Sequence, residues 1–384
     1  MRARDLGISI GLLQPGPLNA ITDVAGVRVG HTTLIVGDGE LVAGKGPIRT
    51  GVTVLLPHDG DPFSESLFAG AHRLNGNGEL TGLEWIREAG LLTSPIAITN
   101  THSVGVVRDA LVTAAMRSRG PGETAWSLPV VGETWDGWLN DIEGRHVTAE
   151  HLFAALDSAA GGVVEEGTVG GGTGMMCHGF KGGIGTASRQ LAEDAGGYTV
   201  GALVQANYGR RERLAIDGVP VGREIGLDEV PSDWATARGS ARDSADTATG
   251  SIIVILATDA PLLPHQCERL AQRAGLGVAR SGGAGEHSSG DLFLAFATGN
   301  RGMSVGDGSR AIDRERTLSM LDDSWISGLF WAAIESTEEA IANALVAAET
   351  VTGRDGHTAF RLPHDRLVEV WQRHRGGGVA ALSR

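Results

Sequence analysis

The residues with the most specific chemical possibilities are Gly250 and Ser251, which join a polar segment to an apolar one. The segment ending at Gly250 has no apolar periodicity, whereas residues 252–257 form a short apolar run that predicts a buried strand. A serine at the start of a core strand is held on a rigid element, and rigid elements position reactive groups best. The glycine before it leaves its carbonyl open to attack and tolerates unusual backbone conformations.

This pair is suited to self-cleavage of the chain. Ser251 would attack the carbonyl of Gly250, the resulting ester would hydrolyse, and Ser251 would become a new N-terminus. An α-amine has a pKa of about 7.7–8.0, so it can act as general base for the hydroxyl beside it. A serine that begins an ordinary core strand fits the same residues, and both interpretations stand at this point.

A second polar cluster, residues 286–291, comes directly before another apolar run, residues 292–297. If the two predicted strands are neighbours, Ser289 and Asp291 could face Ser251, orient it and bias its protonation. Serine and aspartate also cap turns routinely, which is the alternative for both residues.

Two further polar residues mark predicted strands. Asn207 ends the strand predicted from residue 200 to 206, and its side-chain amide could donate to an oxyanion; an asparagine that simply terminates a strand is the alternative. Glu133 lies in residues 130–140, a strand that runs into an aromatic loop.

The other motifs that could carry chemistry are incomplete or have an unsuitable spacing. His146, Glu150 and His151 have neither spacing of the zinc-binding helices. Cys177 is a lone cysteine among glycines, a setting more typical of a small buried side chain than of a nucleophile. The glycine-rich residues 170–185 lack a complete phosphate-binding motif. We therefore expect no metal and no cofactor.

Composition limits the class of protein. The chain has 384 residues, a length that allows one large domain or two ordinary ones, and 41% of the residues are hydrophobic, enough for a substantial core. Its net charge of −14 argues against nucleic acid and anionic membrane surfaces as partners. No run is long and apolar enough to span a membrane, and residues 1–7 do not resemble a signal peptide. With only two cysteines, we expect a cytoplasmic protein without disulfides.

Predicted helices and strands alternate along the chain, which indicates an α/β or α+β protein with layered sheets. Strands are predicted at 51–56, 95–99 and 197–206, and helices at 102–119 and 148–160. A helix from Pro264 is predicted to stop at Gly275, and Ser336 with Glu339 predicts the start of another. Residues 228–250 have no usable period and are predicted to form an exposed linker or loop.

Several segments, taken in order, resemble one family. They are Asp23-Val-Ala-Gly-Val-Arg-Val-Gly-His31, Leu74-Asn-Gly-Asn-Gly-Glu-Leu-Thr-Gly-Leu-Glu84, Thr99-Asn-Thr-His-Ser-Val-Gly105, Phe180-Lys-Gly-Gly-Ile-Gly-Thr186, Gln205-Ala-Asn-Tyr-Gly209 and Ser251-Ile-Ile-Val. The chain resembles the DmpA-type self-processing aminopeptidases, which include D-aminopeptidase/esterase and β-peptidyl aminopeptidases. The resemblance spans nearly the whole chain and favours Ser251 as a nucleophile.

The resemblance implies a four-layer α/β/β/α sandwich, similar in layering to the N-terminal-nucleophile hydrolases but with different connectivity. It implies a single domain, residues 1–384, cut into an α chain of residues 1–250 and a β chain of residues 251–384 that stay together, usually as a homotetramer. Of the site residues, Ser251 looks like the nucleophile, Ser289 and Asp291 like the pair that tunes it, Asn207 like the oxyanion donor and Glu133 like the carboxylate that binds the substrate's free amine.

The predicted function is thus a self-processing serine aminopeptidase that acts on short peptides, amides or esters with a free amine. Two departures from the family pattern leave the preference for L-, D- or β-amino acids open. Asp291 stands where some relatives have Glu, and Trp138 and His146 lie near the loop after Glu133, where some relatives place a tyrosine. One alternative is an amine acyltransferase of the ornithine acetyltransferase type, although those carry a threonine nucleophile. The other is a binding protein that keeps the fold and is never cleaved.

Overall fold

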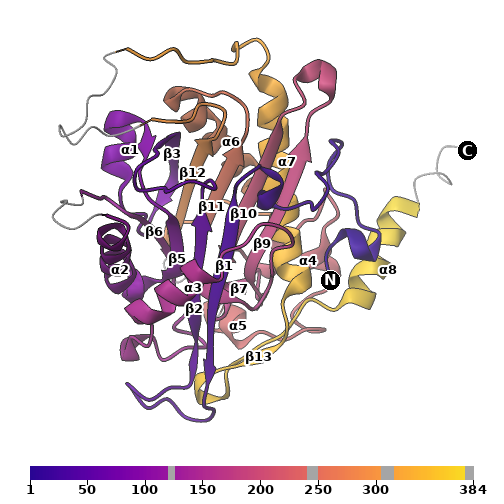
Figure 1. Cartoon of the computed structure of the whole chain (residues 1–384). Coiled ribbons are helices and arrows are strands. Elements are labelled where there is room, and N and C mark those ends of the chain that lie inside the picture. The colour runs from indigo at the N-terminus through magenta and orange to yellow at the C-terminus, as the bar shows by residue number, and fades with distance from the viewer. Residues whose placement is uncertain (120–125, 240–249, 304–314, 377–384) are drawn as a thin grey trace, which may run out of the picture.

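The strands of the chain form two main sheets that lie face to face (Figure 1). The computed structural model describes residues 1–119, 126–239, 250–303 and 315–376. The smaller sheet has the strand order β1-β2-β5-β6, with β1 (Arg28–Val36), β2 (Ile48–Leu56), β5 (Ile96–Asn100) and β6 (Val130–Thr134). In this sheet β5 and β6 run parallel, whereas the other pairs are antiparallel.

The larger sheet has six strands in the order β4-β3-β12-β11-β10-β9. These are β4 (Leu91–Leu92), β3 (Leu67–Gly76), β12 (Ser289–Ala297), β11 (Gly250–Thr258), β10 (Thr199–Asn207) and β9 (Gly183–Gln190). Only its central pair, β11 and β12, is parallel. Two short ladders pair β7 (Met176–Cys177) with β8 (Phe180–Lys181), and β13 (Val351–Thr352) with β14 (Thr358–Ala359).

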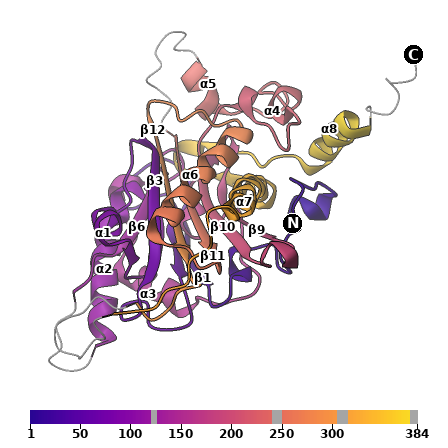
Figure 2. The same ribbon diagram turned by 90° about the horizontal axis from the view of Figure 1, so that it is seen from above.

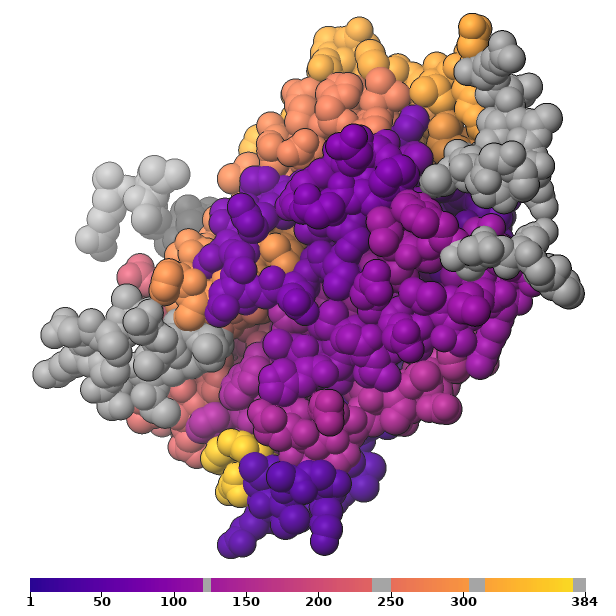
Figure 3. All heavy atoms as spheres, turned by 90° about the vertical axis from the view of Figure 1, so that its left-hand side faces the viewer, coloured from indigo at the N-terminus to yellow at the C-terminus, as the bar shows by residue number. Residues whose placement is uncertain are grey.

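Helices cover the outer face of each sheet, which completes the four-layer α/β/β/α sandwich predicted above (Figure 2). Helices α6 (Pro264–Arg280) and α7 (Ile326–Ala347) pack on the larger sheet, and α2 (Val104–Arg117) and α3 (Ala149–Asp157) on the smaller one. The remaining helices are α1 (Leu83–Ala89), α4 (Val221–Glu224), α5 (Asp233–Gly239) and α8 (His364–Gly376). Residues from the first half of the chain form most of the face seen in Figure 3. Within the described residues, no helix is long and apolar enough to cross a membrane.

The apolar residues of β11 divide between two cores. Ile252 and Val254 pack in the core under α6 and α7, whereas Ile253 and Ile255 pack in the core between the sheets. Successive side chains of a strand point to opposite faces, so this division assigns every residue of β11 to one face. Ser251 therefore belongs to the face that meets the smaller sheet.

Three predictions from local sequence were wrong. Gly275 does not end α6, which continues to Arg280. The continued helix contains a second glycine, Gly277, which allows α6 to approach α7 closely. A Cβ at position 277 would lie 2.7 Å from the Cβ of Thr337. The segment 228–250 is not a featureless linker, since it contains α5; residues 240–249 lie outside the described part of the chain.

The predicted capping pair Ser336 and Glu339 lies in the middle of α7, not at its start. Glu339 is buried and accepts a hydrogen bond from Arg189, at 2.6 Å, and another from Arg4. Its carboxylate therefore neutralises a buried arginine instead of capping a helix, and sequence spacing alone does not distinguish the two roles.

Candidate active site

Ser251 lies at the end of the parallel pair β11 and β12, so the two apolar strands predicted around the reactive residues are neighbours. It is paired with Gly290, and its Oγ accepts a hydrogen bond from the Gly290 N–H at 3.2 Å. The side chain is 6% exposed. A Cβ at position 290 would lie 2.4 Å from the carbonyl oxygen of Asn77, so only glycine fits between Ser251 and the loop after β3.

Ser289 and Asp291 form a buried pair beside the Gly250–Ser251 bond. The Ser289 hydroxyl donates to Asp291 Oδ1 at 2.5 Å, and Ser289 is paired with Gly250 across the strands. Burial raises the pKa of Asp291 to about 6, against the opposing effects of the Ser289 hydroxyl and the Ile252 N–H. Because side chains alternate, both residues lie on the helix-covered face of the sheet, opposite to the Ser251 side chain. They adjoin the Gly250–Ser251 peptide bond rather than the hydroxyl of Ser251.

Asn207 lies opposite Ser251 on the other side of β11, at the end of β10. It is 2% exposed and its side-chain amide is fixed at both ends. The oxygen Oδ1 accepts from the Met176 N–H at 2.8 Å, and Nδ2 donates to the Trp135 carbonyl at 2.9 Å. An amide nitrogen has two N–H groups, so one donor of Asn207 remains for another acceptor.

Glu133 reaches the site from the smaller sheet, at the end of β6. Its Oε1 accepts from the Glu79 N–H at 2.9 Å, and its Oε2 accepts from the Thr101 hydroxyl. The residue is 2% exposed, and burial raises its pKa although both hydrogen bonds oppose that shift. A Cβ at Gly78 would lie 2.9 Å from Glu133 Oε1 and 3.2 Å from the Cα of Gly290. Gly78 thus lies between the carboxylate and Gly290, the residue of β12 that is paired with Ser251.

The structure therefore brings together Ser251, Asn207, Ser289 and Asp291 at one end of the larger sheet and links Glu133 to them through Gly78. Sequence reasoning did not assign the groups that hold these side chains. Thr101 occurs in the segment Thr99–Gly105 used for the family resemblance but was given no role, and the Glu79 N–H and Trp135 carbonyl are backbone groups that no residue type reveals.

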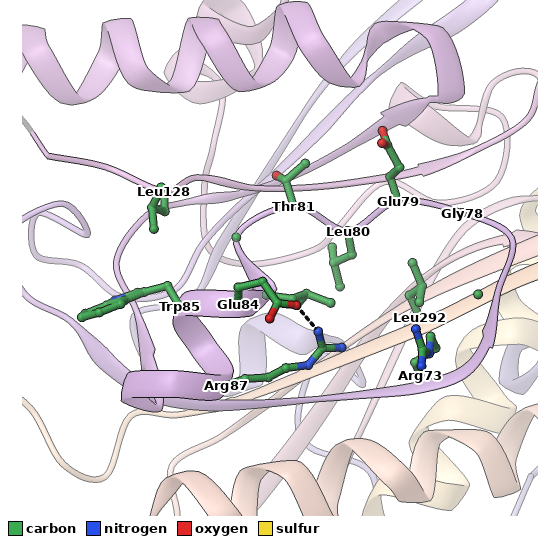
Figure 4. Close-up of a pocket in the computed structure, with 13 residues that line it drawn as sticks. Arg73, Gly78, Glu79, Leu80, Thr81, Glu84, Trp85, Arg87, Leu128 and Leu292 are labelled. Carbon is green, nitrogen blue, oxygen red and sulfur yellow. Dashed lines mark hydrogen bonds and ion pairs between the residues drawn. The ribbon is translucent and has the colours of Figure 1, made fainter.

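A cavity of about 430 Å³ lies beside the loop that holds Glu133. In Figure 4, Leu80 and Leu292 line its interior, whereas the side chain of Glu79 points away from it. Glu84 and Arg87, joined by an ion pair, form part of its wall. The segment from Gly78 to Leu80 thus lines this cavity and also donates the Glu79 N–H to the carboxylate of Glu133.

The other reactive groups weighed from sequence are poorly suited to chemistry. Cys177 is fully buried, and burial raises the pKa of its thiol to about 12, which disfavours the nucleophilic thiolate. His146 Nε2 donates to the Asp141 carboxylate, and His151 takes part in the cap of α3. Across residues 1–119, 126–239, 250–303 and 315–376, no three His, Cys, Asp or Glu side chains are grouped as metal ligands are.

A serine at the mouth of a buried strand in an α/β/β/α sandwich, with a fixed amide beside it, defines a hydrolase of the N-terminal-nucleophile type. Comparison with known proteins supports this class. Residues 19–359 match the model of peptidase family S58, and the chain belongs to this family. It is a serine aminopeptidase, and the relatives described next are enzymes of the same kind.

A relative in Sphingosinicella microcystinivorans, named beta-peptidyl aminopeptidase BapA, is 50% identical over 376 residues, which cover 97% of this chain and 92% of that protein. Among solved structures, a beta-aminopeptidase of a Burkholderia species has a TM-score of 0.88 at 56% identity, over 98% of this chain and 99% of the other. An L-aminopeptidase D-Ala-esterase/amidase from Ochrobactrum anthropi, described as a prototype of the serine aminopeptidases and a variant of the Ntn hydrolase fold, has a TM-score of 0.82 at 42% identity, with the same coverage.

Proposed function

We propose that the chain cuts its own Gly250–Ser251 bond, giving residues 1–250 and 251–384, and that Ser251 then serves as the nucleophile of the aminopeptidase. The observation that carries the proposal is the setting of Ser251: a buried hydroxyl at a strand end, bonded to the Gly290 N–H and flanked by the amide of Asn207.

The self-cleavage would proceed in two balanced steps. Ser251 Oγ attacks the carbonyl carbon of Gly250, the C–N bond breaks, and the nitrogen gains the hydroxyl proton to become a free amine. Water then attacks the same carbon, the C–O bond breaks, Oγ regains a proton, and Gly250 is left with a carboxylate. A Cβ at position 250 would lie 3.0 Å from the Cα of Tyr208 and 3.1 Å from the Asn207 carbonyl oxygen, so a glycine suits the crowded cleavage site.

The freed amine is then the general base for the hydroxyl of the same residue. Ser251 attacks the substrate carbonyl, the remaining N–H of Asn207 stabilises the oxyanion, and water hydrolyses the acyl-enzyme. The pair of Ser289 and Asp291 adjoins the nitrogen of Ser251 and tunes its protonation. Glu133, with a buried carboxylate, binds the ammonium group of the substrate, which limits the enzyme to residues with a free amine.

For the substrate, we infer a preference for peptides and amides that begin with a β-amino acid. The support is the similarity, 50% and 56% in identity over nearly the whole chain, to proteins named beta-peptidyl aminopeptidase and beta-aminopeptidase. The relative named for L-aminopeptidase and D-Ala-esterase activity is less similar, at 42% identity.

The test is hydrolysis of β-alanyl, L-alanyl and D-alanyl p-nitroanilide by the purified wild type beside Ser251→Ala. We expect the β-alanyl substrate to give the highest kcat/KM and the variant to be inactive. Faster cleavage of either α-amino substrate would reject the β-preference, and an equally active Ser251→Ala would reject the nucleophile.

No observation favours the acyltransferase or the uncleaved binding protein. The homotetramer expected from the resemblance and the cytoplasmic location expected from the composition stay predictions. Both cysteines, Cys177 and Cys267, are free and buried.

A further inference from the structure

We infer that Thr101 is a positioning residue for Glu133, holding its carboxylate ionised and oriented toward the ammonium group of the substrate. This inference rests on the proposed role of Glu133. Thr101 touches no reacting atom, and its effect on the reaction passes through the carboxylate.

The strand topology places Thr101 next to Glu133. Strands β5 and β6 are parallel, and Glu133 is paired with Thr99, two residues before Thr101. Thr101 follows the last residue of β5 directly and begins the short turn that leads into α2. The carboxyl ends of two adjacent parallel strands thus bring the hydroxyl and the carboxylate to the same edge of the smaller sheet.

Two donors hold the carboxylate of Glu133, one on each oxygen. The Thr101 hydroxyl donates to Oε2, and the Glu79 N–H donates to Oε1 at 2.9 Å. An ionised carboxylate has about four acceptor sites, so each oxygen keeps capacity for a second donor. An ammonium group has three N–H donors and can use both remaining sites.

The charge of Glu133 is not neutralised by these contacts. A hydroxyl and a backbone amide are uncharged, and within the described residues Glu133 makes no ion pair. Burial has the largest effect on Glu133 and raises its pKa. The titratable groups that act on it from neighbouring elements are Glu79, which raises the pKa, and His102, which lowers it. A buried, hydrogen-bonded and uncompensated carboxylate is suited to a cationic ligand.

Loss of the Thr101 hydroxyl should therefore weaken binding of the amine in a pH-dependent way. The hydrogen bond lowers the pKa of Glu133 against the effect of burial. Without it the pKa rises further, and the carboxylate is protonated at a higher pH. Because the ammonium group needs the ionised form, the acidic limb of kcat/KM should move to higher pH.

The experiment compares Thr101→Val, which removes the donor at nearly constant volume, with Thr101→Ser, which keeps it. We expect Thr101→Val to raise KM for β-alanyl p-nitroanilide about tenfold, in line with loss of a hydrogen bond to a charged group, and to change kcat little. Thr101→Ser should restore the wild-type KM and pH profile. Thr113→Val on α2, whose hydroxyl donates only to the Asp109 carbonyl, is the matched control and should behave as the wild type.

Two results would overturn the inference: a wild-type KM and pH profile in Thr101→Val, or a Thr101→Ser as impaired as Thr101→Val, which would indicate a purely structural role. If the valine variant does not fold, Thr101→Ala provides the same comparison.

Glu133→Gln separates this inference from the proposed function. A large rise in KM in Glu133→Gln with none in Thr101→Val rejects Thr101 alone. An unchanged KM in Glu133→Gln rejects amine binding by Glu133 and the role of Thr101 with it, but leaves the proposed role of Ser251 as nucleophile standing.

Discussion

Asn207 lies directly opposite Ser251 across the antiparallel strands β10 and β11. Both side chains belong to the face of the larger sheet that meets the smaller one, since the alternation along each strand is fixed by the two cores. Hydrogen bonds to the Met176 N–H and the Trp135 carbonyl hold the amide of Asn207 before any substrate arrives. A donor fixed in advance stabilises a developing oxyanion without reorganisation during the reaction.

Replacement of this donor should therefore act on the chemical step. We predict that Asn207→Ala lowers kcat for β-alanyl p-nitroanilide by about 100- to 1,000-fold, with a much smaller effect on KM. Steady-state kinetics on processed enzyme would measure this. The control is Asn300→Ala, which removes a side-chain amide that donates a hydrogen bond to the Ser319 carbonyl. A kcat within a few-fold of wild type in Asn207→Ala would exclude the oxyanion role.

The buried carboxyl of Asp291 predicts an acidic limit to activity. Burial raises its pKa to about 6, so the protonated form persists to a higher pH than for an exposed aspartate. If the amine of Ser251 needs the ionised form beside it, kcat/KM should fall as the pH drops through about 6. The fall near pH 6 should be absent from Asp291→Asn, which should keep only the acidic limb set by Glu133 and should have low activity at every pH. An Asp291→Asn variant that retained the wild-type profile would assign the limb to another group.

The close packing around Gly290 provides a steric test of the site. We predict that Gly290→Ala abolishes measurable activity, because its Cβ would meet the Asn77 carbonyl at 2.4 Å and displace the loop that holds Glu133. Gly105→Ala in α2 is the matched control, since a Cβ there meets nothing within 4 Å, and it should keep full activity. Equal activity of the two variants would show that the loop tolerates displacement.

The buried cluster under α7 predicts a large effect on stability. Arg189 is fully buried and bonds Glu335 at 3.1 Å and Glu339 at 2.6 Å. Arg189→Ala should lower the free energy of unfolding by about 3–5 kcal/mol, because it leaves the buried carboxylate of Glu335 without its arginine and that of Glu339 with Arg4 alone. Urea denaturation would measure the change. Arg366→Ala, which removes an ion pair to Glu229 on the surface, should leave the midpoint almost unchanged.

Much of the fold follows from local sequence. The apolar runs at 252–257 and 292–297 predicted two central strands, and the structure pairs them. Where a residue's role depends on a distant part of the chain, local patterns failed. Gly275 was predicted to end α6, but the helix continues past it and packs closely on α7 at Gly277. Glu339 looks like part of a cap until Arg189 is buried beside it.

The candidate site likewise contains residues that the sequence indicated and positions that depend on distant parts of the chain. Ser251 and Asn207 could be singled out because serine and asparagine at strand ends suggest specific chemistry. The positions of Ser289 and Asp291 on the opposite face from the Ser251 side chain follow only from the register of β11 and β12. The hydroxyl of Thr101 reaches Glu133 because two parallel strands end together, which no spacing in the sequence reveals.

The central claim is that Ser251 becomes an N-terminus by cutting the bond before it. The most direct measurement is the denatured mass and N-terminal sequence of freshly purified wild type beside Ser251→Ala. The account predicts two wild-type fragments, residues 1–250 and 251–384, the second beginning Ser251-Ile252, and an intact variant. A wild-type chain that stays intact after long incubation, or a variant cleaved at the same bond, would contradict it.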